Sequence, residues 1–160
     1  MSVSESRVAF SLEDILAALE LRLEVEEVIH KLPLTHALEQ CLLFAQANSL
    51  TELAQLVQQE LNGYSTQPPS DRVVHLSYFD NGGQMINGLS EYSSYPVSLG
   101  VRKLEIRLRN GLALRLPKQI LIFLSQVGGR EVDSGHISPI EINKLLANIR
   151  DVISQKLKSF

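Results

Sequence analysis

Apolar residues recur every three or four positions over most of this chain, and this spacing constrains the fold more than any other feature of the sequence. It is the period of an α-helix that buries one face. The clearest helix start is at Ser138, an N-cap residue followed by Pro139 at the first helical position and Glu141 at the third. We therefore predict a long C-terminal helix after Ser138, with a buried face formed by Ile142, Leu145, Leu146, Ile149, Ile153 and Leu157.

Three more helices are predicted in the N-terminal part of the chain. The first follows Ser11, where Asp14 provides a weak form of capping box, and it continues with a bend as far as Pro33. Residues 1–10 in front of it are expected to be flexible. The second covers residues 34–47 and places Cys41 on its apolar stripe.

A two-residue turn joins the second predicted helix to the third. We expect Ser49 to cap the third helix, with Glu52 completing a capping box, and Gly63 to end it in the left-handed conformation. Two helices joined by so short a turn lie antiparallel. The N-terminal half is therefore predicted to contain a helical hairpin.

The composition changes after Gly63. Residues 65–71 contain two prolines and three hydroxyl residues and are predicted to form a loop. Residues 72–79 are rich in β-branched and aromatic residues and predict a strand. Residues 80–100 are rich in glycine, serine and tyrosine, which predicts turns with short strands.

Residues 104–116 fit two structures. Leucine and isoleucine alternate with charged or small residues on both sides of Asn110-Gly111. A β-hairpin with the loop Arg109-Asn110-Gly111 would pair Leu108 with Leu112 and keep all the apolar residues on one face. The alternative is a short helix over about 101–109 that ends at Gly111. We favour the hairpin, although both remain open from the sequence.

A further helix is predicted after Pro117, and Gly128-Gly129 would end it. Residues 130–137 would then be a polar connector or a short edge strand. We expect this helix to bury Ile120, Leu121, Phe123, Leu124 and Val127. The predicted fold is mainly α with a small β component, α+β, in one domain over residues 1–160: an N-terminal helical hairpin, central short strands or a β-hairpin, and two C-terminal helices.

The net charge of −3 conceals an asymmetry. Residues 1–63 contain ten acidic and three basic residues, whereas residues 100–160 contain five acidic and eleven basic ones. The two halves could pair with each other or with a second copy. A basic segment over residues 102–118 could instead bind a nucleic acid backbone, although the pI of about 5.8 is low for such a protein. Its basic residues are Arg102, Lys103, Arg107, Arg109, Arg115 and Lys118.

No motif for catalysis, metal binding or cofactor binding is found in the sequence. The four histidines and one cysteine do not have the spacing of a metal site, and Cys41 is expected to be a buried structural thiol. We therefore expect no cofactor, and we regard an enzyme such as a nuclease as the least favoured class. The start of the chain has no signal-peptide pattern, and no apolar run approaches the roughly 20 residues that span a bilayer. A cytoplasmic location without a membrane partner is expected.

The end of the third predicted helix carries the most specific string in the chain. Residues 53–64 end in Glu60, Leu61, Asn62, Gly63 and Tyr64, and they resemble the signature E-L-x-x-W-x-x-x-E-L-N-G-Y of the AbiTii domain. Residues 114–117 resemble the "L-R-L-P" motif that precedes a helix in that family, and residues 137–139 resemble the first part of its "I-S-P-S-Q" motif before the last helix. Residues 72–74 lie where the family often has "Y-R-V".

The resemblance implies a setting in bacterial abortive infection, a form of defence against phage. It also implies a helix before the "L-R-L-P" motif, where this sequence shows the apolar–polar alternation of a β-hairpin. It implies no catalytic residues. We therefore expect a non-enzymatic interaction or regulatory module that forms homo-oligomers or binds another defence protein, with nucleic acid binding as the alternative.

Overall fold

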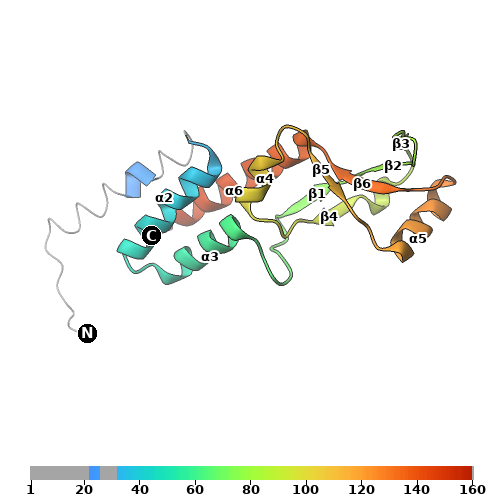
Figure 1. Ribbon diagram of the computed structural model, residues 1–160. Helices are drawn as coiled ribbons and strands as arrows, with labels where there is room; N and C mark the ends of the chain where they lie inside the picture. Colours follow the sequence, from blue (N-terminus) through green and yellow to red (C-terminus); the bar gives the residue numbers. More distant parts are fainter. Residues whose placement is uncertain (1–21, 26–31, 160) are drawn as a thin grey trace, which may run out of the picture.

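The computed structural model describes residues 22–25 and 32–159. The molecule is elongated, with helices at one end and strands with one further helix at the other (Figure 1). Residues 22–25 are helical. Residues 11–21 and 26–31 of the predicted first helix, with its cap at Ser11, lie outside the described residues, as do residues 1–10, and Leu32 and Pro33 are not helical.

The helical end contains the predicted helical hairpin, which is confirmed. It consists of α2 (Leu34–Ala47) and α3 (Thr51–Asn62), and these pack against α4 (Val101–Ile106) and α6 (Pro139–Lys158). Cys41 is fully buried in α2, as predicted. No side chain from the residues next to the start of α2 caps this helix. Instead the Glu105 carboxylate of α4 accepts hydrogen bonds from the amides of Leu34 (3.0 Å) and Thr35 (2.8 Å).

The helix α6 forms as predicted and extends from the helical end toward the strands (Figure 1). The Ser138 side chain accepts a hydrogen bond from the Glu141 amide (3.2 Å), which is the expected N-cap contact. All six residues of the predicted apolar face are buried. This helix therefore supplies one continuous wall of the core.

The prediction that Ser49 caps α3 is wrong. Ser49 has a positive φ of 57°, and the N-cap position is taken by Leu50, with no side-chain cap. The reason lies in the end of α2, where the amide of Leu50 donates back to Ala45 O (2.8 Å). Ser49 thus serves to close the preceding helix instead of opening the next one.

The strands form two small antiparallel sheets. A two-stranded sheet pairs β1 (Val73–His75) with β4 (Ser94–Pro96). A four-stranded sheet has the order β3-β2-β6-β5, built from β2 (Ser77–Phe79), β3 (Met85–Ile86), β6 (Ser134–Ile137) and β5 (Leu112–Leu114). The predicted strand over 72–79 is therefore divided at Leu76 between the two sheets. Residues 65–71 contain neither helix nor strand.

The strand β6 lies between β2 and β5, so the expectation of a connector or edge strand over 130–137 is wrong. The sequence Ser134-Gly135-His136 has little apolar character, yet a Cβ added to Gly135 would lie only 3.3–3.5 Å from the side chains of Leu116, Tyr78 and Leu76. A residue without a side chain is suited to this close packing.

The favoured β-hairpin over 104–116 is also wrong. Residues 101–106 form α4, and β5 pairs with β6 instead of with residues 104–108. Val101 and Leu104 are buried on one face of α4 against the helical end, while Ile106 is 77% exposed. The alternative prediction of a short helix before Gly111 is close to the structure. Gly111 has a φ of +75°, and its amide donates to Arg107 O (2.8 Å).

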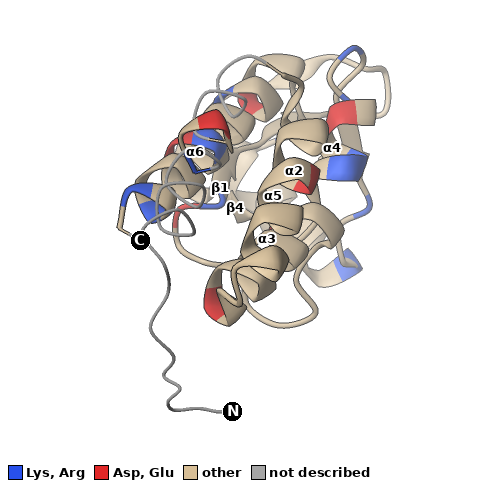
Figure 2. Cartoon of the chain, turned by 90° about the vertical axis from the view of Figure 1, so that its left-hand side faces the viewer, with Lys and Arg blue, Asp and Glu red and all other residues tan. Residues whose placement is uncertain are grey.

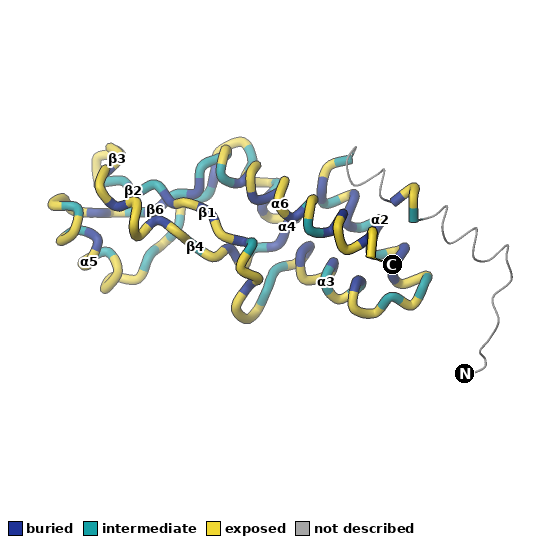
Figure 3. The backbone as a smooth tube through the Cα atoms, turned by 180° about the vertical axis from the view of Figure 1, so that it is seen from behind, coloured by how far each residue is buried: buried dark blue, intermediate teal, exposed yellow. Residues whose placement is uncertain are grey.

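The helix α5 (Lys118–Gly128) begins after Pro117 and ends at the left-handed Gly129, as predicted. Its predicted burial is wrong. Within this fully described helix Leu124 is the only buried residue, Leu121 is half-buried, and Ile120, Phe123 and Val127 are exposed. The helix covers the outer end of the molecule and meets the remainder on one side (Figures 1 and 3).

The predicted class, α+β with helix predominating, is confirmed, as are the two C-terminal helices α5 and α6. None of the helices in the described part of the chain combines the length and apolar character required to cross a bilayer.

Candidate functional site: a pocket at the helix–strand junction

The helical end joins the strands where the end of α3 crosses the start of α4. Gly63 ends α3 with a φ of +104°, in an extended positive-φ conformation instead of the expected left-handed one. The Tyr64 amide then donates to Ser98 O (2.9 Å). A Cβ on Gly63 would lie 2.8 Å from Ser98 O, and one on Gly100 would lie 2.2 Å from Leu61 O. Both glycines are therefore required for the two backbones to approach so closely.

A buried ion pair holds this junction from inside. The Arg72 side chain is 0% exposed and the Glu60 side chain 4%, and Arg72 Nε donates to Glu60 Oε1 at 2.9 Å. The Tyr64 hydroxyl donates to the other oxygen of the same carboxylate, and its ring lies 5.1 Å from the guanidinium carbon of Arg72. Buried charges are tolerated only when they are paired in this way.

Arg72 also fixes the segment that leads from β4 to α4. Its Nη1 donates to Val97 O (2.6 Å) and to Leu99 O (2.9 Å). Within the described residues, no group accepts a hydrogen bond from the buried Nη2. Burial, aided by the Glu60 hydrogen bond, raises the pKa of the Tyr64 phenol, so Tyr64 keeps the proton that it donates.

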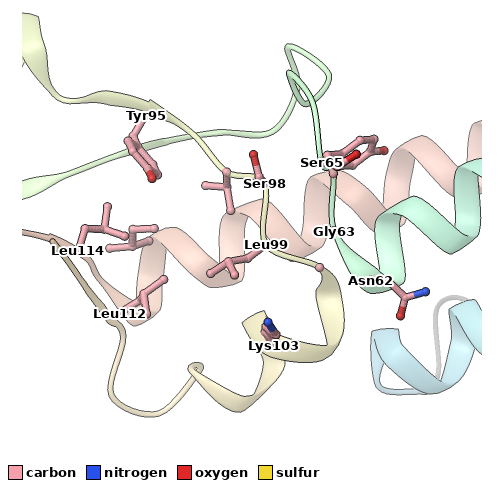
Figure 4. A pocket seen from close by; sticks show the side chains of 13 residues that line it. Asn62, Gly63, Ser65, Tyr95, Ser98, Leu99, Lys103, Leu112 and Leu114 are labelled. Carbon is pink, nitrogen blue, oxygen red and sulfur yellow. The ribbon is translucent and has the colours of Figure 1, made fainter. Parts of the chain in front are cut away.

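A pocket of about 640 Å³ opens beside this junction. Figure 4 shows Leu99, Leu112, Leu114 and the Tyr95 ring around one space, with Lys103 on the α4 side. We call it the junction pocket. It is lined by Asn62, Gly63, Tyr64, Ser65, Tyr95, Val97, Ser98, Leu99, Gly100, Lys103, Leu112, Leu114 and Ile137.

The residues singled out in the sequence as Glu60–Tyr64 take part in building the junction and its pocket. Glu60 and Leu61 are buried, while Asn62, Gly63 and Tyr64 line the pocket. Asn62 also accepts a hydrogen bond from Arg102 Nε (3.1 Å). The string therefore has a structural explanation at every position.

All six residues of the basic segment are exposed. Arg102 and Lys103 lie on α4, beside the end of α3. Arg107 and Arg109 follow in the loop after α4, Arg115 follows β5, and Lys118 is the first residue of α5. Arg102 pairs with Glu39 of α2 (2.7 Å), so basic and acidic residues meet between these two helices (Figure 2). This contact joins the basic half to the acidic half within one chain.

Arg72 and Glu105 were not identified from the sequence as important residues. Arg72 stands at the start of an apolar, β-prone run, and a charged residue in such a position is a signal of a buried pair. Glu105 gave no such signal, because it caps a helix about seventy residues away in the chain.

The histidines and the cysteine in the described part of the chain form no arrangement suited to catalysis or metal binding. No cluster of three or more potential metal ligands occurs there. The ring of His75 contacts the Ser93 hydroxyl (3.2 Å), but Glu141 binds the His75 backbone amide and not its ring. Burial raises the pKa of the Cys41 thiol to about 12, which keeps it protonated and unreactive at neutral pH.

A second surface feature lies on α5, at the opposite end from α2. Ile120, Phe123 and Val127 are spaced at i, i+3 and i+7 and are each 43–46% exposed. Tyr92 is 41% exposed and meets Phe123 edge to face, with 5.1 Å between ring centroids. We call these four residues the α5 stripe.

Comparison with known proteins gives no relative. No family model matches the chain, and neither the curated proteins nor the solved structures contain a significant match. The resemblance to the AbiTii domain therefore remains a hypothesis from the sequence.

Proposed function

We propose that this chain is a non-enzymatic interaction module of a bacterial abortive-infection system, acting in the cytoplasm and associating with copies of itself. The defence setting is supported by the resemblance of residues 53–64 to the AbiTii signature. Self-association is supported by a separate observation, the exposure of the α5 stripe.

The α5 stripe has the spacing of a helix–helix contact. Residues at i, i+3 and i+7 form one row along a helix, and such rows pack against the equivalent row of another helix. Lys118 is the only charged residue in α5, which is described in full, so a neutral apolar partner suits it best. A second α5 meets that requirement through a two-fold contact.

The expected affinity of one copy of the chain for another is modest. Each side chain of the stripe is already more than half buried, so covering the remainder contributes about 1 kcal/mol. Four such residues from each copy give about 8 kcal/mol, and the loss of translational freedom offsets much of this. We therefore expect a dimer that forms at micromolar to millimolar protein concentration.

Sedimentation over a concentration series tests this proposal with the pair Phe123→Glu and Ile106→Glu. The first places a charge in the stripe, while the second changes an equally apolar, 77% exposed residue on α4. Wild type and Ile106→Glu should dimerise and Phe123→Glu should stay monomeric. A wild-type monomer at all concentrations, or equal behaviour of the two variants, would contradict the proposal.

Nucleic acid binding is the second candidate, and the exposure of all six basic side chains favours it. Binding of this kind weakens steeply with salt, because each phosphate contact releases counterions. The double variant Arg107→Glu/Arg109→Glu should reduce both affinity and salt dependence, whereas Lys156→Glu/Lys158→Glu at the end of α6 should not. Negligible retention of both DNA and RNA at low salt would exclude this function.

A further inference from the structure

The junction pocket has the size and surface of a small-molecule site. Its volume of about 640 Å³ lies within the range of about 300–1,000 Å³ that is usual for ligand pockets. One side is apolar and combines residues from three separate segments: Leu99 before α4, Leu112 and Leu114 on β5, and Ile137 on β6. Such a surface requires a ligand with an apolar body.

The charge of the pocket favours a negative group on that ligand. Among the residues that line it, all of them described, Lys103 is the only charged one. Lys103 is exposed and forms no ion pair within the described part of the chain. Its neighbour Arg102, by contrast, is occupied by Glu39 and Asn62. One free cation at the side of an apolar space is complementary to a single anionic group.

The walls of the pocket are held in place before any ligand arrives. Arg72 binds the carbonyls of Val97 and Leu99 from behind, and it is itself fixed by Glu60. The close crossing at Gly63 and Gly100 fixes the end of α3 against the start of α4. A preformed wall lowers the ordering entropy that binding would otherwise have to overcome.

We propose that the junction pocket binds a small monocarboxylate with an apolar body, of the class of medium-chain fatty acids. The carboxylate lies beside Lys103, and the apolar chain lies along Leu99, Leu112 and Leu114. This inference is independent of the proposed self-association, because the pocket and the α5 stripe have no residue in common.

Calorimetric titration of the full chain with decanoate tests the site. Decanoate should bind saturably, and decyltrimethylammonium, with a similar chain and the opposite charge, should bind at least fivefold more weakly. Lys103→Glu should lower the affinity for decanoate at least fivefold, as expected when a partly exposed ion pair becomes a repulsion. Lys118→Glu makes the same change of charge outside the pocket and should leave the affinity within twofold.

Two further variants separate this site from other apolar surfaces. Leu114→Asp should abolish binding, and circular dichroism shows whether that variant is folded. Phe123→Glu should bind decanoate as wild type does, because the α5 stripe is not the site. The inference is overturned if decanoate does not saturate, if Lys103→Glu binds as tightly as Lys118→Glu, or if the cationic amphiphile binds equally well.

Discussion

At the scale of single residues, Arg72 connects parts of the chain that lie far apart in the sequence. It is completely buried, yet it reaches the side chain of Glu60 and the backbone of Val97 and Leu99. A guanidinium presents several donors in a fixed plane, which allows one residue to connect three segments. Its position in an apolar run signals a buried pair, but its partners could not be read from the sequence, because they lie 12 to 27 positions away.

Replacing Arg72 should be far more damaging than replacing an exposed arginine. In Arg72→Leu the Glu60 carboxylate stays buried without its cation, which costs about 3–5 kcal/mol. In Arg102→Leu the exposed pair with Glu39 is lost, which costs at most about 1 kcal/mol. Urea denaturation of both variants measures the difference in the free energy of unfolding. Similar losses in the two would show that the buried pair is not important for stability.

At the scale of elements, the helices that the sequence predicts well are those whose signals are local. The cap at Ser138 and the stop at Gly129 depend on neighbouring residues, and both are confirmed. The hairpin predicted over residues 104–116 is wrong because the apolar spacing there fits a strand as well as a helix. The deciding factor is that Val101 and Leu104 can be buried against the helical end.

The same distinction between local signals and distant contacts explains why most of the apolar face of α5 is exposed. Its apolar periodicity correctly predicts a helix, but periodicity does not say how much of the apolar face finds a partner within the chain. Of the five residues expected to be buried only Leu124 is, and the residues of the α5 stripe remain exposed. The junction pocket was likewise not predictable, since Asn62, Lys103 and Leu114 meet only in the folded chain.

The helix α2 depends on a cap supplied from another element. Glu105→Ala removes the acceptor for two amides at the start of α2 and should lower the free energy of unfolding by about 1–2 kcal/mol. Glu131→Ala, at an exposed position after α5, should change it by less than about 0.5 kcal/mol. Thermal unfolding followed by circular dichroism compares the two. Equal melting temperatures would mean that this cap does not stabilise α2.

At the scale of the whole molecule, the two ends are joined by few but close contacts. The crossing of Gly63 and Gly100 includes the shortest contact among the described glycine positions, and α6 extends from the helical end as far as β1. Rigidity at the junction is therefore expected to control how the helical end sits on the strands.

Adding one methyl group at this crossing tests that expectation. A Cβ at Gly100 would meet backbone atoms that cannot rotate away, so Gly100→Ala should cost at least about 1–3 kcal/mol. Gly82→Ala, where the nearest atom lies 3.5 Å away and φ is not positive, should be close to neutral. Differential scanning calorimetry of both variants gives the comparison. If Gly100→Ala were as stable as Gly82→Ala, the junction would be able to shift and accommodate an added methyl group.

The position of α6 has a consequence for the order in which the protein can be completed during synthesis. Its buried residues, from Ile142 to Leu157, belong to the same core as α2 and α3. The ribosome produces α2 and α3 about a hundred residues before α6. Until Leu157 has been added, the core that α2 and α3 share with α6 is therefore incomplete, and apolar surface left open in this way is what makes partly folded chains prone to aggregation.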